Sequence, residues 1–140
     1  MMDTRLIGNW SLVSYVTENP DGSRGKPYGD AVGRLSYDEL GNMAGQVMRP
    51  NRLEVAPGQW GTQEVRSAYA GYIAYFGTYE VNADGDAVVH HVHGALNPGW
   101  VGGDQVRRMR FDGDLLILST DVPKGGALVR HTLTWKKLGR

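Results

Sequence analysis

Turn-forming residues recur at short intervals along the whole of this chain. Twenty of its 140 residues are glycine, about twice the usual share. Between the clusters of Gly, Pro, Asp and Asn, polar and apolar residues alternate, which is the period of a strand with one buried face. Short alternating runs with regular turn signals are typical of an all-β sandwich or barrel.

Eight of these runs are predicted to be strands. They span residues 9–18, 33–38, 42–49, 75–82, 87–95, 104–112, 115–120 and 128–137. Hairpin signals join several of them, such as Asn82-Ala83-Asp84-Gly85. A meander of eight strands closes most readily into an up-and-down antiparallel barrel, because closure removes the exposed edges. The interior of such a barrel is filled by side chains or holds one small ligand.

One segment has the spacing of a helix. After a loop over residues 50–61, apolar residues recur three and four positions apart, at Val65, Ala68, Tyr69, Tyr72, Ile73 and Phe76. A short helix over residues 63–74 is therefore predicted between the third and fourth strands, with Thr62 as its N-cap and Glu64 in its first turn. The pattern leaves open whether this Tyr-rich helix fills the lumen of the barrel.

Composition excludes several classes of protein. Fifteen acidic residues balance fifteen basic ones, which argues against a nucleic-acid binder, and no apolar run is long enough to cross a membrane. The lack of cysteine excludes disulfides, thiolate metal sites and a cysteine nucleophile. The first ten residues, MMDTRLIGNW, lack the apolar core of a secretory signal. The expectation is one cytoplasmic domain over residues 1–140.

A motif at the first strand points to a known family. Gly8-Asn9-Trp10 stands where lipocalins carry their Gly-x-Trp motif. Further matching stretches are residues 6–15, 32–37, 46–50, 70–79, 88–92, 97–102 and 105–108. Over nearly its whole length the chain resembles the bacterial and fungal lipocalin-like domain family, whose fold is an eight-stranded calycin-type barrel. The relatives of that family include carriers, cyclases, isomerases and decarboxylases, so the fold does not determine the function.

The resemblance also implies a role for Trp10. In lipocalins this Trp closes the floor of the barrel and stacks against a basic group from the final strand. Arg130 and Lys136 are the candidates for that partner here, and Arg is the better stacking group.

Strand alternation selects two polar residues for the lumen. Arg107 shares a strand face with Met109, and His90 alternates with valines. A buried guanidinium needs a carboxylate or a ligand anion, and a histidine with a near-neutral pKa suits proton transfer or hydrogen bonding to a polar ligand. The alternatives are an ion pair at the rim for Arg107 and, for His90, a core position in which a neighbouring Tyr satisfies the ring.

The three histidines at positions 90, 91 and 93 raise the question of a metal site. Such a site would need a further ligand from a neighbouring strand, for example His131, and no HExxH or Cys/His spacing supports it. No metal site is predicted.

The remaining candidate contacts are apolar wall residues and aromatic side chains, and the aromatic ones combine apolar area with a polar group, which suits a small and mostly apolar ligand. These candidates are Tyr72, Tyr75, Met43, Val47, Trp60, Trp100, Met109 and His131. Trp60 and Trp100 lie in the two loops expected to rim the opening. Plain core packing by the helix is the alternative for Tyr72, and plugging of the barrel end is the alternative for the two tryptophans.

The leading hypothesis is a barrel that binds a small hydrophobic or aromatic metabolite in its lumen, beside a polar patch of His90 and Arg107. The alternative is a cofactor-free cyclase, isomerase or dehydratase for a polyketide- or terpenoid-like substrate, with His90 as acid or base and with Arg107 and Tyr79 polarising a carbonyl. A haem-binding barrel of the nitrobindin type, with His131 as axial ligand, is disfavoured because the Gly8–Leu12 start departs from that family's extra glycines. No cofactor, nucleic acid or membrane is expected as a partner, and a homodimer is left open.

Overall fold

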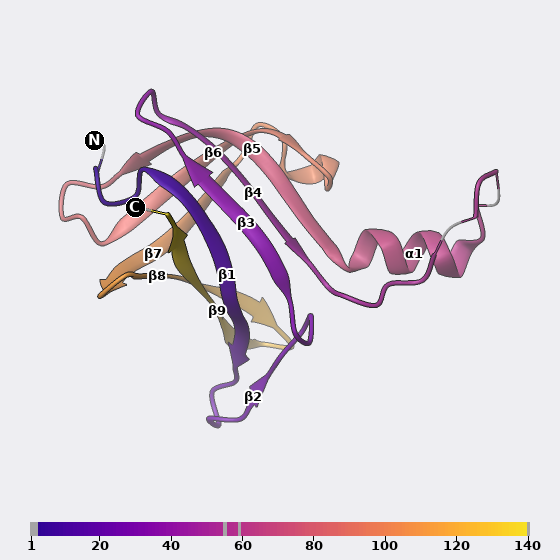
Figure 1. Ribbon diagram of the computed structural model, residues 1–140. Coiled ribbons are helices and arrows are strands. Elements are labelled where there is room, and N and C mark those ends of the chain that lie inside the picture. Colours follow the sequence, from indigo (N-terminus) through magenta and orange to yellow (C-terminus); the bar gives the residue numbers. More distant parts are fainter. Residues whose placement is uncertain (1–2, 55, 59, 140) are drawn as a thin grey trace.

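The structure, a computed structural model, describes residues 3–54, 56–58 and 60–139. Nine strands, one α-helix and one short 3₁₀ helix follow one another along the chain (Figure 1). They are β1 (Gly8–Glu18), β2 (Arg24–Gly25), β3 (Val32–Tyr37), β4 (Asn42–Met48), α1 (Thr62–Ala70), β5 (Tyr72–Val81), β6 (Ala87–Ala95), η1 (Pro98–Trp100), β7 (Asp104–Asp112), β8 (Leu115–Lys124) and β9 (Ala127–Leu138).

Eight of these strands form a closed antiparallel barrel, as the sequence predicted. Strand β1 pairs with β3, each later strand pairs with the next, and β9 returns to pair with β1. The two-residue β2 pairs only with the end of β1, and no alternation is long enough to predict it. Because β2 precedes it, the helix lies between β4 and β5. Within the described residues, no helix has the length and apolar character needed to span a bilayer.

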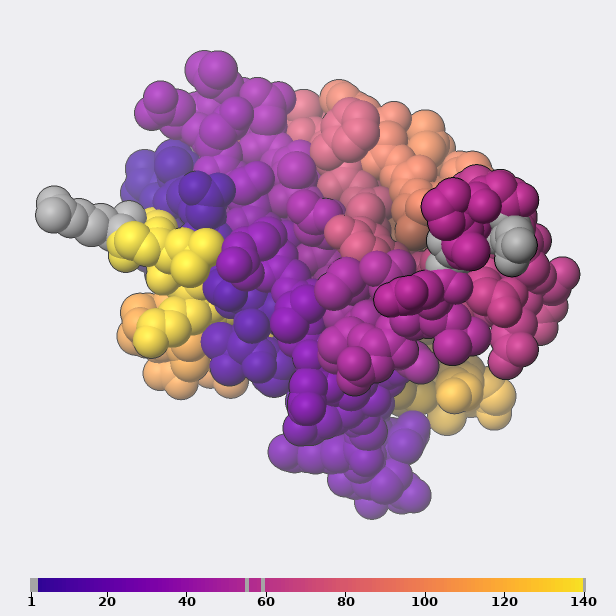
Figure 2. Space-filling view, turned by 45° about the vertical axis from the view of Figure 1, so that its right-hand side comes forward, coloured from indigo at the N-terminus to yellow at the C-terminus, as the bar shows by residue number. Residues whose placement is uncertain are grey.

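The helix is shorter than predicted, and it does not fill the lumen. It ends at Ala70 with Gly71 as its C-cap, and Gly61 rather than Thr62 precedes its first turn. Tyr72 and Ile73, which the pattern assigned to the helix, instead pair with β4 at the start of β5. None of the residues of α1 is buried. Figure 1 shows α1 projecting sideways from the barrel, and in Figure 2 the same segment forms the right-hand edge of the molecule.

One end of the barrel is closed by packed side chains around Trp10. Its indole nitrogen donates a hydrogen bond to the Leu6 carbonyl at 2.9 Å. The basic group over its ring is that of Lys137, with Nζ 5.4 Å from the ring centroid, and not Arg130 or Lys136 as predicted. Lys137 is the register partner of Trp10, whereas Arg130 and Lys136 alternate to the outer face, where they meet Asp121 and Asp114.

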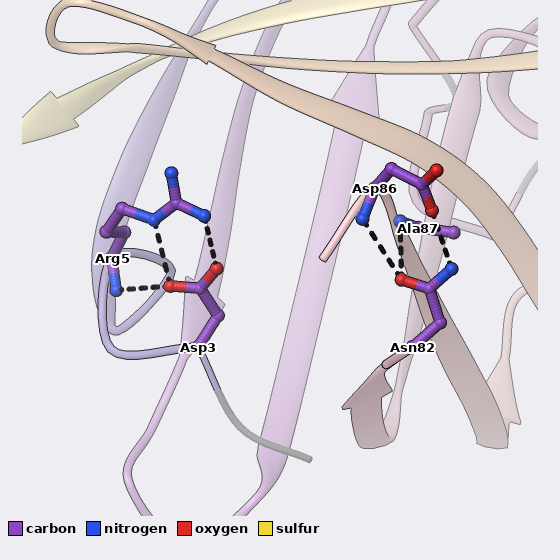
Figure 3. A network of polar contacts seen from close by, with 5 residues as sticks. All are labelled: Asp3, Arg5, Asn82, Asp86 and Ala87. Carbon is purple, nitrogen blue, oxygen red and sulfur yellow. Dashed lines mark hydrogen bonds and ion pairs between the residues drawn. The ribbon is translucent and has the colours of Figure 1, made fainter. Parts of the chain in front are cut away.

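Two polar networks secure the turns at this closed end (Figure 3). Asp3 accepts hydrogen bonds from the backbone and guanidinium of Arg5, whose charge lies 4.2 Å from the ring centroid of Phe111. In the β5–β6 hairpin, the side-chain oxygen of Asn82 accepts from the backbone amides of Asp86 and Ala87 at 3.0 and 3.1 Å. An asparagine that bonds to the backbone in this way fixes a turn locally.

Replacing Asn82 with alanine is expected to lower the free energy of unfolding by about 1 kcal/mol, because two amides lose their acceptor. Urea denaturation at neutral pH measures the loss. Asp84→Ala is the matched control, since Asp84 is exposed in the same turn. Equal unfolding free energies for the two variants would contradict this role of Asn82.

A β-bulge changes which residues of β1 face inward. The register between β1 and β9 shifts between Leu12 and Ser14, so one residue of β1 has no partner. A strand that gains one residue reverses its alternation beyond that point. Tyr15 is therefore buried, although simple alternation from Trp10 places it outside.

Candidate functional site

A cavity of about 360 Å³ lies in the half of the barrel away from Trp10. Every strand of the barrel contributes to its wall, and most of that wall is apolar. The lining residues are Tyr15, Leu35, Gly45, Gln46, Val47, Ile73, Tyr75, His90, Trp100, Gln105, Arg107, Leu118, Thr120, Val122, His131, Leu133 and Trp135. The interior of the barrel therefore provides a space for a small ligand.

The structure brings six of the predicted site residues together around this cavity. They are Val47, Tyr75, His90, Trp100, Arg107 and His131. They come from strands β4, β5, β6, β7 and β9 and from η1, so segments far apart in the sequence converge on one space.

Five other predicted site residues lie outside the cavity wall. Met43, Met109 and Tyr79 face inward but belong to the packed core, and the Tyr79 hydroxyl donates to the Asp38 carbonyl at 2.8 Å. Tyr72 donates to the Gln46 side chain and lines a separate hollow beside α1. Trp60 is 76 % exposed.

His90 is the buried polar centre of the site. Its side chain is 2 % exposed, and both ring nitrogens are engaged, Nε2 with the Tyr37 hydroxyl at 2.6 Å and Nδ1 with the Tyr75 hydroxyl at 2.7 Å. Burial, assisted by the charge of Arg107, lowers the pKa of His90 to about 3. The ring is therefore neutral near pH 7 and carries one N–H.

The position of that proton follows from the two tyrosines. Among the described residues, the fully buried Tyr37 hydroxyl has no second partner, so it donates its proton to Nε2. Nδ1 then carries the hydrogen of His90 and donates to the Tyr75 oxygen. The proton of the Tyr75 hydroxyl is left to donate into the cavity that this residue lines.

A second Tyr–His pair lies on the opposite part of the wall. The Tyr15 hydroxyl is 2.7 Å from Nδ1 of His131, and the ring of Tyr28 packs edge-on against Tyr15. Burial raises the pKa of Tyr15 to about 12 and lowers the pKa of His131, so both groups are neutral at pH 7.

Arg107 places a positive charge at the cavity without a matching carboxylate. Its guanidinium donates to the Gln105 side chain at 2.8 Å and to the Val106 carbonyl at 3.0 Å. No ion pair joins it to an acidic residue of the described chain, and no acidic residue lines the cavity. On the outer face of the barrel, by contrast, Asp121 forms ion pairs with Arg108 and Arg130.

Trp135 adds an unsatisfied donor to the cavity wall. Its side chain is 3 % exposed and lines the cavity, and its indole N–H is buried without a hydrogen-bond partner in the part of the chain that the structure describes. An unpaired buried donor costs about 1–3 kcal/mol, and a ligand oxygen would remove that cost.

Sequence reasoning missed Tyr15 and Trp135 for different reasons. Tyr15 was hidden by the β1 bulge, which alternation cannot anticipate. Trp135 lies four residues beyond His131 on β9, so strand alternation puts both side chains on the same face of the sheet. The inward orientation of Trp135 could therefore have been predicted from the sequence.

A closed eight-stranded antiparallel barrel with a cavity in its interior is an architecture that can hold one small ligand. The chain belongs to the lipocalin-like domain family, because residues 7–138 match the model of that family. It is also 35 % identical over 109 residues to the 4'-hydroxy-3'-methoxypropiophenone carrier protein ppsC of Aspergillus oryzae. That match covers 70 % of this chain and 98 % of the relative. A ligand-binding or carrier role is thereby supported.

Proposed function

We propose that this protein binds and carries a small aromatic ketone or phenol in the barrel cavity. The observation that carries the proposal is a mostly apolar cavity lined by two donor groups. The Arg107 guanidinium has no carboxylate partner among the described residues, and the Trp135 indole N–H is buried there without a hydrogen-bond partner. A ligand with one aromatic ring and oxygen acceptors complements such a wall.

The size and shape of the wall support a ligand of this class. A volume of about 360 Å³ lies within the range of small-ligand pockets, roughly 300–1,000 Å³. The rings of Tyr75 and Trp100 meet edge to face at 6.1 Å and give one side of the cavity an aromatic surface. The ligand in the name of the Aspergillus relative, a hydroxylated and methoxylated propiophenone, has this chemistry.

The arrangement favours a carrier over the cyclase, isomerase or dehydratase considered above. Both nitrogens of His90 are held by tyrosines, and a pKa of about 3 makes the ring a poor general base near pH 7. The hydroxyl of Tyr79 is committed to a backbone carbonyl in the core, away from any substrate in the cavity.

Titration with 4'-hydroxy-3'-methoxypropiophenone tests the proposal. We expect saturable quenching of tryptophan fluorescence at one site, since Trp100 and Trp135 line the cavity. Trp100→Ala is expected to weaken binding about tenfold through loss of ring contact, and Trp60→Ala, at an exposed position, is the matched control. Mass spectrometry should recover the probe unchanged. Absence of saturation would contradict the proposed function, and a new product mass would favour the enzymatic alternative.

A further inference from the structure

We propose that the cavity binds a hydroxyaryl ketone as its phenolate anion, with Arg107 as the counter-charge. This inference rests on the proposed function and deepens it, because it states which protonation form of the ligand is selected. On binding, the phenol O–H bond breaks, the electron pair stays on the oxygen, and the proton passes to bulk water.

The charge balance of the wall carries the first step. The titratable groups that face the cavity are Tyr15 of β1, Tyr75 of β5, His90 of β6, Arg107 of β7 and His131 of β9. The cavity-facing residues of the other strands carry no titratable group: Leu35 of β3, Gly45, Gln46 and Val47 of β4, and Leu118, Thr120 and Val122 of β8.

Only one of those titratable groups is charged near neutral pH. Burial lowers the pKa of both histidines and raises the pKa of both tyrosines, so all four are neutral. The guanidinium of Arg107 carries the one positive charge among them. The residues that line the cavity therefore carry a net charge of about +1, and an anion of one charge balances it.

The hydrogen-bonding capacity of the wall gives the second step. The side-chain oxygen of Gln105 already accepts from Arg107, and that of Gln46 accepts from Tyr72. The hydroxyls of Tyr15 and Thr120 and the ring of His131 can accept as well as donate. The remaining groups, Tyr75, Arg107 and Trp135, offer donors. An ionised oxygen accepts several of these donors at once, whereas a phenol brings a further donor into a wall already rich in them.

The placement of the donors gives the third step. His131 and Trp135 face the same cavity from positions four residues apart on β9, which separates their Cα atoms by roughly 13 Å. A ketone para to a hydroxyl puts its two oxygens at opposite ends of one ring. Arg107 lies at the level of His131, because the register of Arg108 with Ser119 puts Arg107 beside Thr120, which pairs with His131. The phenolate oxygen at the Arg107 end and the ketone oxygen at the Trp135 end would each find a donor.

An absorbance titration of 4'-hydroxy-3'-methoxypropiophenone tests the inference, because the phenolate of a hydroxyaryl ketone absorbs at longer wavelength than the phenol. The pKa of the free probe is measured in the same buffers. The bound probe is expected to ionise at least one pH unit lower, which corresponds to phenolate binding about tenfold tighter than phenol. The 4'-O-methyl ether of the probe, which cannot ionise, should bind at least about tenfold more weakly at a pH where the free probe is ionised.

Variants of two arginines on one strand separate charge from folding. Arg107→Gln should abolish the downward shift in the ionisation of the bound probe, and Arg107→Lys should retain part of it. Arg110→Gln, on the outer face of β7, is the matched control and should retain the whole shift. Thermal unfolding of each variant verifies that the barrel is folded.

The outcomes distinguish the inference from the function on which it rests. If the probe and its ether bind equally and the bound probe keeps the phenol spectrum, phenolate selection is wrong and the carrier function stands. If an unshifted spectrum accompanies tight binding in every variant, the role of Arg107 is also wrong. If neither compound binds, the proposed function and this inference both fail.

Discussion

Acidification from pH 7 to pH 4.5 is expected to lower the free energy of unfolding by about 2–3 kcal/mol, mainly through His90. Its pKa is about 3 in the folded barrel and about 6.5 in the unfolded chain. Between these values the unfolded chain binds a proton that the folded barrel does not. Stability therefore falls as the pH drops below about 6.5.

Other groups titrate in different windows or with the opposite sign. The pKa of His131 is also lowered by burial, so this group adds to the loss in the same window. Hydrogen bonds to Asp104 and Glu80 raise the pKa of His91, so its contribution is complete below about 6.5 and is lost at higher pH. Asp3 and Asp121 have pKa values lowered by their arginine partners, and their contributions are lost only below about pH 4.

Urea denaturation over a series of pH values measures this effect. His90→Gln should flatten the slope between pH 6.5 and pH 4.5, because an amide does not titrate and can still bond to Tyr37 and Tyr75. At pH 7 the same variant should be about 1–2 kcal/mol less stable, since its geometry is poorer. His93→Gln, at an exposed position of β6, is the control and should keep the slope of the wild type. An unchanged slope in His90→Gln would show that another group governs acid unfolding.

The orientation of individual residues could be predicted from the sequence wherever the strands are regular. Alternation correctly turned His90 and Arg107 toward the lumen. A regular stretch of strand has a strict period of two, and the register shift of β6 at His93 lies beyond His90. The same rule failed for Tyr15, where one extra residue in β1 reverses the faces. Helical spacing in turn misassigned Tyr72 and Ile73, because their spacing fits a helix as well as a strand and pairing with β4 decides their state.

Depth along the barrel could not be predicted from alternation. Met43, Tyr79 and Met109 face inward as expected, yet they lie in the packed floor and leave the cavity to residues nearer the other end. A period of two says which face of the sheet a side chain occupies and nothing about where the interior is filled. That boundary depends on the summed volumes of side chains from all eight strands, which meet only in the folded barrel.

Filling the cavity through Gly45 should separate binding from folding. Gly45 lines the cavity from β4, and the absence of a side chain there leaves room for a ligand. A Cβ at this position would meet the flexible end of Leu35 at 3.1 Å, and the nearest backbone atom, the Arg34 carbonyl oxygen, is 4.0 Å away. Because the backbone of Gly45 lies outside the left-handed region, a larger residue fits there without backbone strain.

Gly45→Leu is therefore expected to weaken binding of 4'-hydroxy-3'-methoxypropiophenone at least about 100-fold, because the leucine side chain takes the space of the aromatic ring, whose burial contributes roughly 3 kcal/mol. The free energy of unfolding should stay within about 1 kcal/mol of the wild type, since the new side chain enters an apolar space. Ala44→Leu adds the same side chain to the outer face of β4 and should leave affinity unchanged. Full binding by a folded Gly45→Leu variant would place the ligand elsewhere on the protein, because the leucine side chain overlaps any ring bound against Gly45.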